Sequence, residues 1–296
     1  MQPADRPARL SVGVVGAGRV GSALGVALSR AGHAVVAVSG VSDASRRRAA
    51  DRLPSAEVLP ADEVVRRVDL VLLTVPDDVL PQVVNGLAEV GAFRPGQLVA
   101  HTSGRHGLDV LRPAAAHGAL PLALHPVMTF AGGAEDVERL NGTSFGVTAP
   151  EPLRAAGEAL VVEMGGEPVW VPEEARVLYH AALAWGSNYL VTLVTTAADL
   201  LRAAGAERPD LLLAPLLGAA LDNALRRGDA ALTGPVSRGD AGTVAAHLDV
   251  LRGNAPEVVP AYTALARLTA DRALRDGRLD ATSAEALLDA LAGGTP

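Results

Sequence analysis

The chain of 296 residues contains no cysteine and no lysine. The absence of cysteine excludes disulfides, thiolate nucleophiles and cysteine-ligated zinc or iron–sulfur clusters. All 26 basic residues are arginine, so a lysine Schiff base and a lysine general acid are excluded too, except at the chain's own amino terminus. No pair of histidines has the close spacing and carboxylate support of a metal site, and we expect no metal.

The chain also lacks a positive net charge and long apolar runs. Its formal charge of -7 and its pI near 5.5 argue against nucleic acid and anionic membrane surfaces, which attract basic patches. No window supplies the ~20 uninterrupted apolar residues of a membrane-spanning helix, and the opening MQPADRPARL has no apolar core of a signal peptide. We therefore expect a cytoplasmic protein with no nucleic-acid or membrane partner.

The first 171 residues alternate short β-branched runs with helical patterns. This alternation is typical of βαβ units and predicts an α/β, Rossmann-like domain with a mainly parallel sheet. The expected strands are LSVGVV (10–15), HAVVAVS (33–39), VDLVLLTV (68–75), GQLVAHT (96–102), ALPLALH (119–125), TSFGVTA (143–149) and EPVWV (167–171).

Beyond Pro172 the pattern becomes helical throughout. One long helix is predicted from Glu173 to Gly205, with an acidic first turn and Arg202 near its end. Further helices are expected over 209–227, 240–252, 256–275 and 282–292. We therefore predict two domains, a Rossmann-like domain over residues 1–171 and an all-α domain over residues 172–296.

A GxGxxG motif follows the first expected strand. The strand ends at the first glycine, a helix with small residues follows, and a second strand begins soon after, which is the context of a dinucleotide-binding turn. Gly16 is expected to allow the tight turn, Gly18 to let the backbone approach a pyrophosphate, and Gly21 to let the helix pack close to the sheet. The predicted phosphate-binding residues are Gly16, Ala17, Gly18, Arg19, Val20 and Gly21.

The end of the second strand bears on the choice between NAD and NADP. NAD-preferring proteins have an acidic residue there that binds the ribose hydroxyls, whereas this chain has Ser39. The hydroxyls of Ser39 and Ser42, with the nearby Arg46, suit a 2′-phosphate. The alternatives are an arginine run that only faces solvent and a ribose contact from Asp43. We predict NADP(H) as the cofactor.

The third expected strand ends in Thr74, Val75 and Pro76, on the carboxyl edge of the sheet, where ligands bind in open α/β folds. Pro76 has no amide hydrogen to donate, so the chain leaves the sheet there and is expected to pass over the cofactor. The next two strands end in AHTSGRHG and LHPVMTF, which brings Ser103 and His125 to the same edge.

A second group of polar residues lies in VLYHAALAWGSNYLVTL. At ~100° per residue, His180 and Ser187 lie about 20° apart around the helix axis and Asn188 lies about 80° from His180, so all three can face one cleft. Asparagine is disfavoured inside a helix. Asn188 therefore indicates either a substrate contact or a hydrogen bond to a neighbouring helix.

The stretch LTGPVSRGD (232–240) interrupts the helical half with two glycines and a proline. Asp240 is predicted to cap the helix that follows. Arg238 lies two residues before that cap and can point away from the helix, so we predict that it binds a substrate carboxylate through two parallel hydrogen bonds. A polar loop without a ligand is the alternative.

Six motifs together resemble a known family: GAGRVG, TVPDD, HTSG, HPVMTF, YHAALAWGSNYL and TGPVSRGD. They are similar to two-domain NADP-linked oxidoreductases in which a Rossmann-like domain precedes a helical domain of unknown function, DUF2520. The family lies in the 6-phosphogluconate and β-hydroxyacid dehydrogenase-like group, and some members resemble alternative ketopantoate reductases. The resemblance implies NADPH, hydride transfer to a small 2-oxo acid or imine, and a homodimer formed through the helical domain.

The chain departs from the wider group at one position. The hydroxyacid dehydrogenases and ordinary ketopantoate reductases of that group carry a lysine proton donor on the first long helix, followed four residues later by asparagine. Asn188 matches the asparagine, but Ala184 occupies the lysine position. The proton must then come from another donor, such as His125, His180 or water; an unperturbed imidazole, with a pKa of about 6.5, suits the role.

These observations predict an NADPH-dependent oxidoreductase that reduces a C=O or C=N bond of a small carboxylate substrate, such as ketopantoate or a cyclic imine. The alternatives are a non-catalytic NADP-binding sensor or scaffold and a deazaflavin-linked NADP reductase. The predicted catalytic and substrate-binding residues are Asn188, Ser103, His125, His180, Arg238 and the capping residue Asp240.

Overall fold

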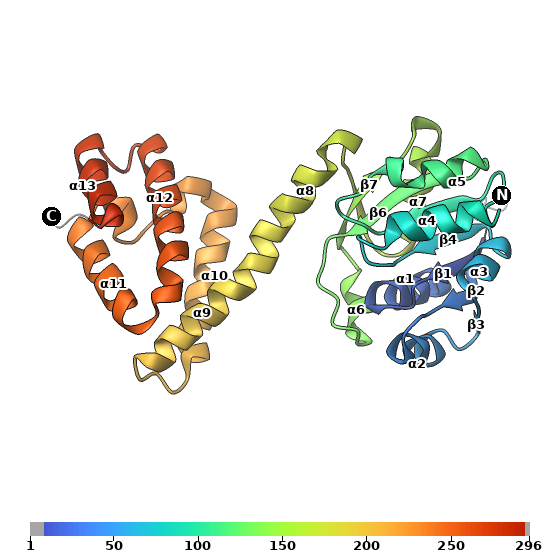
Figure 1. Ribbon diagram of the computed structural model, residues 1–296, viewed down its shortest axis with the longest axis horizontal. Coiled ribbons are helices and arrows are strands. Elements are labelled where there is room, and N and C mark those ends of the chain that lie inside the picture. The colour runs from blue at the N-terminus through green and yellow to red at the C-terminus, as the bar shows by residue number, and fades with distance from the viewer. Residues whose placement is uncertain (1–8, 294–296) are drawn as a thin grey trace, which may run out of the picture. The chain divides into compact units, whose positions relative to one another are not determined.

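The computed structural model describes residues 9–293 (Figure 1). The chain forms two compact units that divide between Ser187 and Asn188. The expected domain boundary at residue 171 stays a prediction. Most of the opening segment considered for a signal peptide, residues 1–8, lies outside the described residues. Across residues 9–293 no helix is long and apolar enough to cross a membrane.

Within the described residues, eight strands form one sheet in the order β3-β2-β1-β4-β5-β6-β7-β8. Neighbouring strands run parallel except β6 and β7, which are antiparallel. The strands are β1 (Ser11–Val15), β2 (Ala34–Ser39), β3 (Glu57–Val58), β4 (Leu70–Leu73), β5 (Leu98–His101), β6 (Leu120–Pro126), β7 (Ser144–Thr148) and β8 (Glu167–Trp170). The predicted α/β, mainly parallel fold is confirmed, with all seven expected strands. The sequence did not predict β3, which has two exposed residues at the edge of the sheet.

Helices connect these strands in the first unit, and a last one follows β8. They are α1 (Arg19–Arg30), α2 (Asp43–Arg52), α3 (Ala61–Arg66), α4 (Leu80–Glu89), α5 (Arg112–Ala116), α6 (Glu135–Arg139), α7 (Arg154–Glu163) and α8 (Arg176–Leu183). The central strand β4 shows why both faces of the sheet need a cover, because all four of its residues are buried. Leu70 and Leu72 pack in the core with α1, α6 and α7, whereas Val71 and Leu73 pack in the core with α3, α4 and α5. A parallel strand buried on both faces is apolar throughout.

The second unit is all-α, as the sequence predicts. Its helices are α9 (Tyr189–Ala203), α10 (Pro209–Arg227), α11 (Ala241–Asn254), α12 (Val259–Arg275) and α13 (Ala281–Ala292). Its buried core joins α11, α12 and α13 through residues such as Leu248, Ala270 and Leu287. By contrast, α9 has no buried residue and α10 buries only Pro209.

The long helix predicted from residue 173 contains a π-helical turn over Ala184–Asn188, between α8 and α9. A π turn bonds each residue to the fifth one along, so the regular 100° per residue does not hold through it. The predicted angles of Ser187 and Asn188 relative to His180 are therefore wrong. Such turns occur frequently at functional sites.

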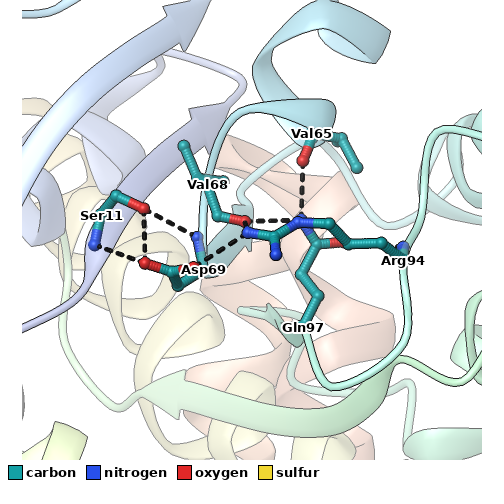
Figure 2. A network of polar contacts seen from close by, with 6 residues as sticks. All are labelled: Ser11, Val65, Val68, Asp69, Arg94 and Gln97. Carbon is teal, nitrogen blue, oxygen red and sulfur yellow. Dashed lines mark hydrogen bonds and ion pairs between the residues drawn. The ribbon is translucent and has the colours of Figure 1, made fainter.

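A polar network holds the amino ends of three strands (Figure 2). Asp69, just before β4, accepts hydrogen bonds from the amide and hydroxyl of Ser11 in β1, at 3.2 and 2.7 Å. Arg94 donates to Asp69 at 2.9 Å and to the Val68 carbonyl at 2.5 Å. The buried Gln97, just before β5, also donates to the Val68 carbonyl, at 2.8 Å. Because this network lies at the amino edge, opposite the edge where ligands bind in such sheets, its role is structural.

We expect Asp69→Asn to lower the free energy of unfolding by about 1 kcal/mol at pH 7, since Asp69 is half-exposed and solvent screens its ion pair. Hydrogen bonds from Ser11 and then Arg94 lower the pKa of Asp69 from its ordinary value of 3.8. A lowered pKa stabilises the fold above the unfolded pKa and loses that effect as pH falls through the folded pKa. Urea unfolding should therefore show a difference at pH 7 that shrinks below about pH 4. Asp271→Asn, at an exposed carboxylate, is the control, and an equal loss there would contradict the prediction.

Candidate functional site at the carboxyl edge of the sheet

The glycine-rich turn joins β1 to α1. Gly16 has a φ of 101°, a left-handed conformation that favours glycine. A Cβ on Gly21 would lie 2.3 Å from Thr74 Oγ1 and 2.4 Å from the Gly16 carbonyl oxygen, so a side chain there would push α1 off the sheet. The tight turn and the close helix packing predicted for these two glycines are confirmed.

Gly18 is not required by packing within the chain. The nearest heavy atom to a Cβ built there is the Gly16 carbonyl oxygen, 4.0 Å away. Gly18 is the N-cap of α1 and offers no capping side chain, and the first turn of α1 has no acidic residue. The partial positive charge of the helix N-terminus is therefore left for an anion. The turn, with Ala17 buried and Val20 half-buried, fits a dinucleotide pyrophosphate.

Thr74 connects the end of β4 to this turn. Its amide donates to the Val15 carbonyl at 2.9 Å, and its hydroxyl donates to the Gly16 carbonyl at 2.6 Å. Val75 and the exposed Pro76 follow at the same edge. Thr74 thus helps to shape the turn, and its contact with a cofactor stays a prediction.

A loop after β6 lies against the start of α1. Arg19 Nη1 donates to the Phe130 carbonyl at 3.5 Å. The buried Asp136 fixes the loop by accepting from the amides of Ala131 and Gly132, at 3.0 and 2.7 Å. The contact between Arg19 and this loop was not predicted from the sequence. The buried carboxylate of Asp136 is structural, because it holds the backbone of the loop.

The end of β2 is shaped by the residues predicted to select NADP. The Ser39 carbonyl accepts two amides of the glycine-rich turn, at 3.1 and 2.8 Å. Ser42 caps α2 by accepting from the Ser45 amide at 3.1 Å. Arg46 forms an exposed ion pair with Asp43 at 2.5 Å. Arg46 and Ser42 therefore order this loop, and their contacts with a 2′-phosphate stay predictions.

Two residues from the HTSG motif are buried at the carboxyl end of β5. His101 Nδ1 accepts from the Ser103 amide at 3.2 Å, so Nε2 carries the hydrogen and donates to the Gly107 carbonyl at 2.8 Å. Burial lowers the pKa of His101 to about 3, so this ring is neutral and structural. The Ser103 hydroxyl accepts from the His106 amide at 3.0 Å.

His125 and His180 come together at this edge. Their ring centroids lie 6.0 Å apart, edge to face. A Cβ on Gly104 would lie 2.6 Å from His180 Cδ2 and 3.0 Å from His125 Nε2, so glycine admits both rings. Burial, followed by the charges of Arg176 and His180, lowers the pKa of His125 to about 4. His125 is therefore neutral at physiological pH.

Tyr179 and Arg176 are two further residues at this edge, and neither was predicted from the sequence. Tyr179 Oη lies 2.8 Å from His125 Nδ1. Arg176 is 1% exposed, and its Nη1 donates to the Gly146 carbonyl at 3.3 Å. The available signal was the position of Arg176 on this helix, three residues before Tyr179 and four before His180, since side chains at those spacings are neighbours on a helix surface.

Asn188 and the loop 232–240 belong to the second unit. Asn188 is exposed at the end of the π-helical turn, and both of its roles considered above, a substrate contact and a hydrogen bond to a neighbouring helix, stay predictions. Asp240 caps α11 by accepting from the Thr243 amide at 3.0 Å, and the predicted cap is confirmed. Arg238 is exposed, and its guanidinium forms no hydrogen bond with residues 9–293. Its proposed contact with substrate stays a prediction.

Two other histidines, His33 and His117, lie outside the candidate site. His33 is 4% exposed and lies 2.7 Å from a Glu163 carboxylate oxygen. It packs there because its other nitrogen accepts the Leu10 amide at the start of β1. His117 is exposed. No cluster of three or more metal-ligating side chains occurs in the part of the chain that the structure describes.

Comparisons with known proteins agree with this architecture. A Rossmann-like domain matches residues 2–126, and a domain of unknown function, DUF2520, matches residues 143–269. A proposed NADP oxidoreductase from Bacteroides fragilis is 22% identical with a TM-score of 0.74, covering 89% of this chain and 98% of its own. An imine reductase from a Pseudomonas species is 17% identical with a TM-score of 0.59, covering 96% and 93%. A pyrroline carboxylate reductase from Plasmodium falciparum, with NADP bound, is 14% identical with a TM-score of 0.56, covering 89% and 98%. No curated protein sequence matches the chain.

The strand order, the glycine-rich turn and the helical second unit define a two-domain Rossmann-like protein. The chain belongs to the family that joins a Rossmann-like domain to a DUF2520 domain. The resemblance drawn from its six motifs is confirmed.

Proposed function

We propose that the chain is an NADPH-dependent oxidoreductase that reduces a C=O or C=N bond of a small carboxylate substrate. The observation that carries the proposal is the shared edge: an uncapped α1 at Gly18 and the strand-end His125 both lie at the carboxyl ends of the sheet. The names of similar folds, an NADP oxidoreductase, a pyrroline carboxylate reductase and an imine reductase, support the same reaction class.

Each part of this edge has a chemical task. NADPH supplies a hydride from its nicotinamide ring, and the protein must orient the acceptor and provide a proton. Gly18 and the first amides of α1 bind the pyrophosphate. Ser39, Ser42 and Arg46 bind the 2′-phosphate, with Arg46 exchanging its exposed partner Asp43 for that phosphate. His125 and His180 are the candidate proton donors, and Ser103 positions the acceptor.

Two further residues, which the sequence assigns to substrate, belong to the second unit. Asn188 donates a hydrogen bond to the acceptor group. Arg238 binds the substrate carboxylate, since its exposed guanidinium has no hydrogen bond to a described residue and is free to form two. Ketopantoate, other 2-oxo acids and cyclic imino acids all present a carboxylate beside the reducible carbon.

Arg238→Ala is expected to raise the KM for the substrate at least tenfold, because a bidentate carboxylate contact is lost. Its melting temperature and its NADPH affinity should match those of the wild type, since the side chain makes no hydrogen bond within the described fold. Arg267→Ala, at another exposed arginine of the same unit, is the matched control and should leave KM unchanged. A fall in the melting temperature of Arg238→Ala would show instead that Arg238 stabilises the loop 232–240.

The proposal is tested by following NADPH oxidation with a panel of acceptors: ketopantoate, other small 2-oxo acids and pyrroline-5-carboxylate. Turnover of at least one acceptor, lost in a His125→Ala, His180→Ala double variant, is the expected result. Tight NADPH binding without turnover of any acceptor would instead favour a cofactor-binding sensor. Ala184 supports that alternative, because the wider group has its lysine proton donor at this position.

We also propose a homodimer formed through α9 and α10. Large exposed apolar patches on soluble proteins mark interaction sites, and α9 and α10 expose many large apolar side chains. The exposed apolar residues on these two helices include Leu190, Val191, Leu193, Leu211, Leu212, Leu216, Leu221 and Leu225. Light scattering is expected to give twice the mass of the chain, and a Leu193→Arg, Leu216→Arg variant should give the mass of one chain. A wild-type monomer at micromolar concentration would contradict the proposal.

A further inference from the structure

His125 is held by a tyrosine on the side away from Gly104. Its Nδ1 lies 2.8 Å from Tyr179 Oη, and the two rings meet edge to face with centroids 5.6 Å apart. Its Nε2 is the nitrogen that approaches Gly104, 3.0 Å from a Cβ built there. When the phenol donates to Nδ1, the single hydrogen of the neutral imidazole must be on Nε2. His125 then presents a donor on one side and a hydrogen-bonded phenol on the other.

Arg176 places a buried positive charge beside the same tyrosine. Its Cζ lies 5.9 Å from the centre of the Tyr179 ring. Its Nε and Nη2 are buried and have no hydrogen-bond partner among residues 9–293. No carboxylate of the described chain lies within 4.0 Å of its guanidinium. A buried cation with two unpartnered nitrogens lowers stability, and only the longer-range charges of Glu173 and Asp77 and the nearby Tyr179 offset that cost.

The hydroxyl of Tyr179 lies against β7, where its pKa is raised above the ordinary value of 10 and Arg176 opposes part of that rise. A Cβ on Gly146 would lie 2.3 Å from Tyr179 Oη, so only glycine lets the hydroxyl approach this strand. Burial raises the pKa of Tyr179, whereas the charge of Arg176 and a backbone hydrogen bond at Gly146 act to lower it. Arg176 and Tyr179 thus both contact Gly146 in β7, the residue paired with His125 in the sheet.

We propose that Tyr179 and His125 form a proton relay that protonates the reduced acceptor, with Arg176 stabilising the tyrosinate. The inference rests on the proposed reductase function. As the acceptor carbon gains the hydride, the bond from His125 Nε2 to its hydrogen breaks and that proton moves to the acceptor oxygen or nitrogen. Nδ1 takes the proton of Tyr179, so the imidazole ends neutral in its other tautomer and Tyr179 ends as a phenolate. A proton from solvent then restores both groups.

The relay explains how a chain without lysine donates a proton. A neutral imidazole is by itself a weak acid, and the coupled transfer from Tyr179 spares it from becoming an anion. The charged or titratable groups that act on His125 are Arg176 and His180 from α8 and Asp77 from the loop after β4. Burial, Arg176 and His180 all disfavour an imidazolium at His125, whereas Asp77 favours it. The relay needs no imidazolium.

The chain contains its own control for this pair. In the second unit, His247 Nδ1 lies 2.9 Å from Tyr262 Oη, and the rings meet edge to face at 6.0 Å. That pair has the same contact, but His247 is exposed and Tyr262 is only partly buried, and burial alone raises the pKa of Tyr262. Tyr179→Phe and Tyr262→Phe therefore remove the same hydroxyl with and without the buried arginine.

The deciding experiment uses the free full-length chain, so it does not depend on an acceptor or on NADPH. Nitrogen-15 NMR at pH 7.5 is expected to show His125 as the neutral tautomer with hydrogen on Nε2, and Tyr179→Phe should change its Nδ1 shift while Tyr262→Phe should not. Absorbance titration follows the three tyrosines, and the transition that is missing in Tyr179→Phe belongs to Tyr179. The midpoint of that transition should shift upward in Arg176→Met. Hydrogen on Nδ1, an imidazolium at pH 7.5, or an unchanged Tyr179 midpoint would overturn the relay.

If an acceptor turns over, Tyr179→Phe should lower kcat about 100-fold at unchanged NADPH affinity, and an unchanged kcat would also overturn it. Failure of NADPH binding, measured separately, would count against the reductase function instead.

Discussion

A Gly21→Ala variant is expected to lose NADPH binding and about 2–3 kcal/mol of unfolding free energy. The added methyl group would lie 2.4 Å from the Gly16 carbonyl oxygen, and a backbone atom cannot move aside as a flexible side chain does. The start of α1 must then shift from the sheet, and the amides that bind the pyrophosphate shift with it. Chemical denaturation and a binding titration with NADPH measure the two effects.

Two other glycines separate stability from binding. Gly18→Ala should lower NADPH affinity at least tenfold while changing the unfolding free energy by no more than about 1 kcal/mol, because the chain leaves space for a Cβ there. Gly86→Ala, on an exposed turn of α4 with no atom within 4 Å, should raise stability by about 0.5–1 kcal/mol and leave binding unchanged. Unchanged affinity in Gly18→Ala would contradict the pyrophosphate site.

An Arg176→Met variant is expected to gain about 1 kcal/mol of unfolding free energy while its kcat falls about 100-fold. Methionine fills similar space without a buried charge, so the unfavourable desolvation of two unpartnered nitrogens is removed. The same change removes the cation that stabilises a tyrosinate at Tyr179. A gain in stability with a loss of activity is the mark of a charge retained for function.

The matched control is Arg154→Met. Arg154 also stacks on an aromatic ring, with its Cζ 4.0 Å from the centre of Trp170, but its side chain is 44% exposed. This variant should change stability by less than about 1 kcal/mol and leave kcat unchanged. A loss of more than about 2 kcal/mol in Arg176→Met would show instead that Arg176 is needed to hold β7 and α8 together.

The fold was predictable because its central strands, such as β4, are buried on both faces. Runs such as LVLL in β4 must be apolar at every position, and they stand out between helical segments. The strand β3 was missed because two residues at an exposed edge carry no such constraint. The π-helical turn at Ala184–Asn188 was missed for another reason: periodicity arguments assume one helical spacing, and no local residue pattern identified the wider turn.

The candidate site was predictable where a residue has a backbone task or ends a strand. Gly16, Gly21 and His125 were found in this way. Tyr179 and Arg176 were not, because their importance comes from the tertiary contact of α8 with β6 and β7, which the sequence does not show. Buried arginine is rare, and only the fold reveals that this one is buried beside a tyrosine and a histidine.

The most direct test of the account is equilibrium binding of NADPH and NADH to the full-length protein, measured by calorimetry on the wild type and on Gly18→Ala. The account predicts micromolar affinity for NADPH, at least tenfold weaker binding of NADH, and a loss of NADPH binding in a variant that stays folded. A folded wild-type protein that binds neither nucleotide at millimolar concentration, or that binds NADPH equally well with and without Gly18, would contradict it.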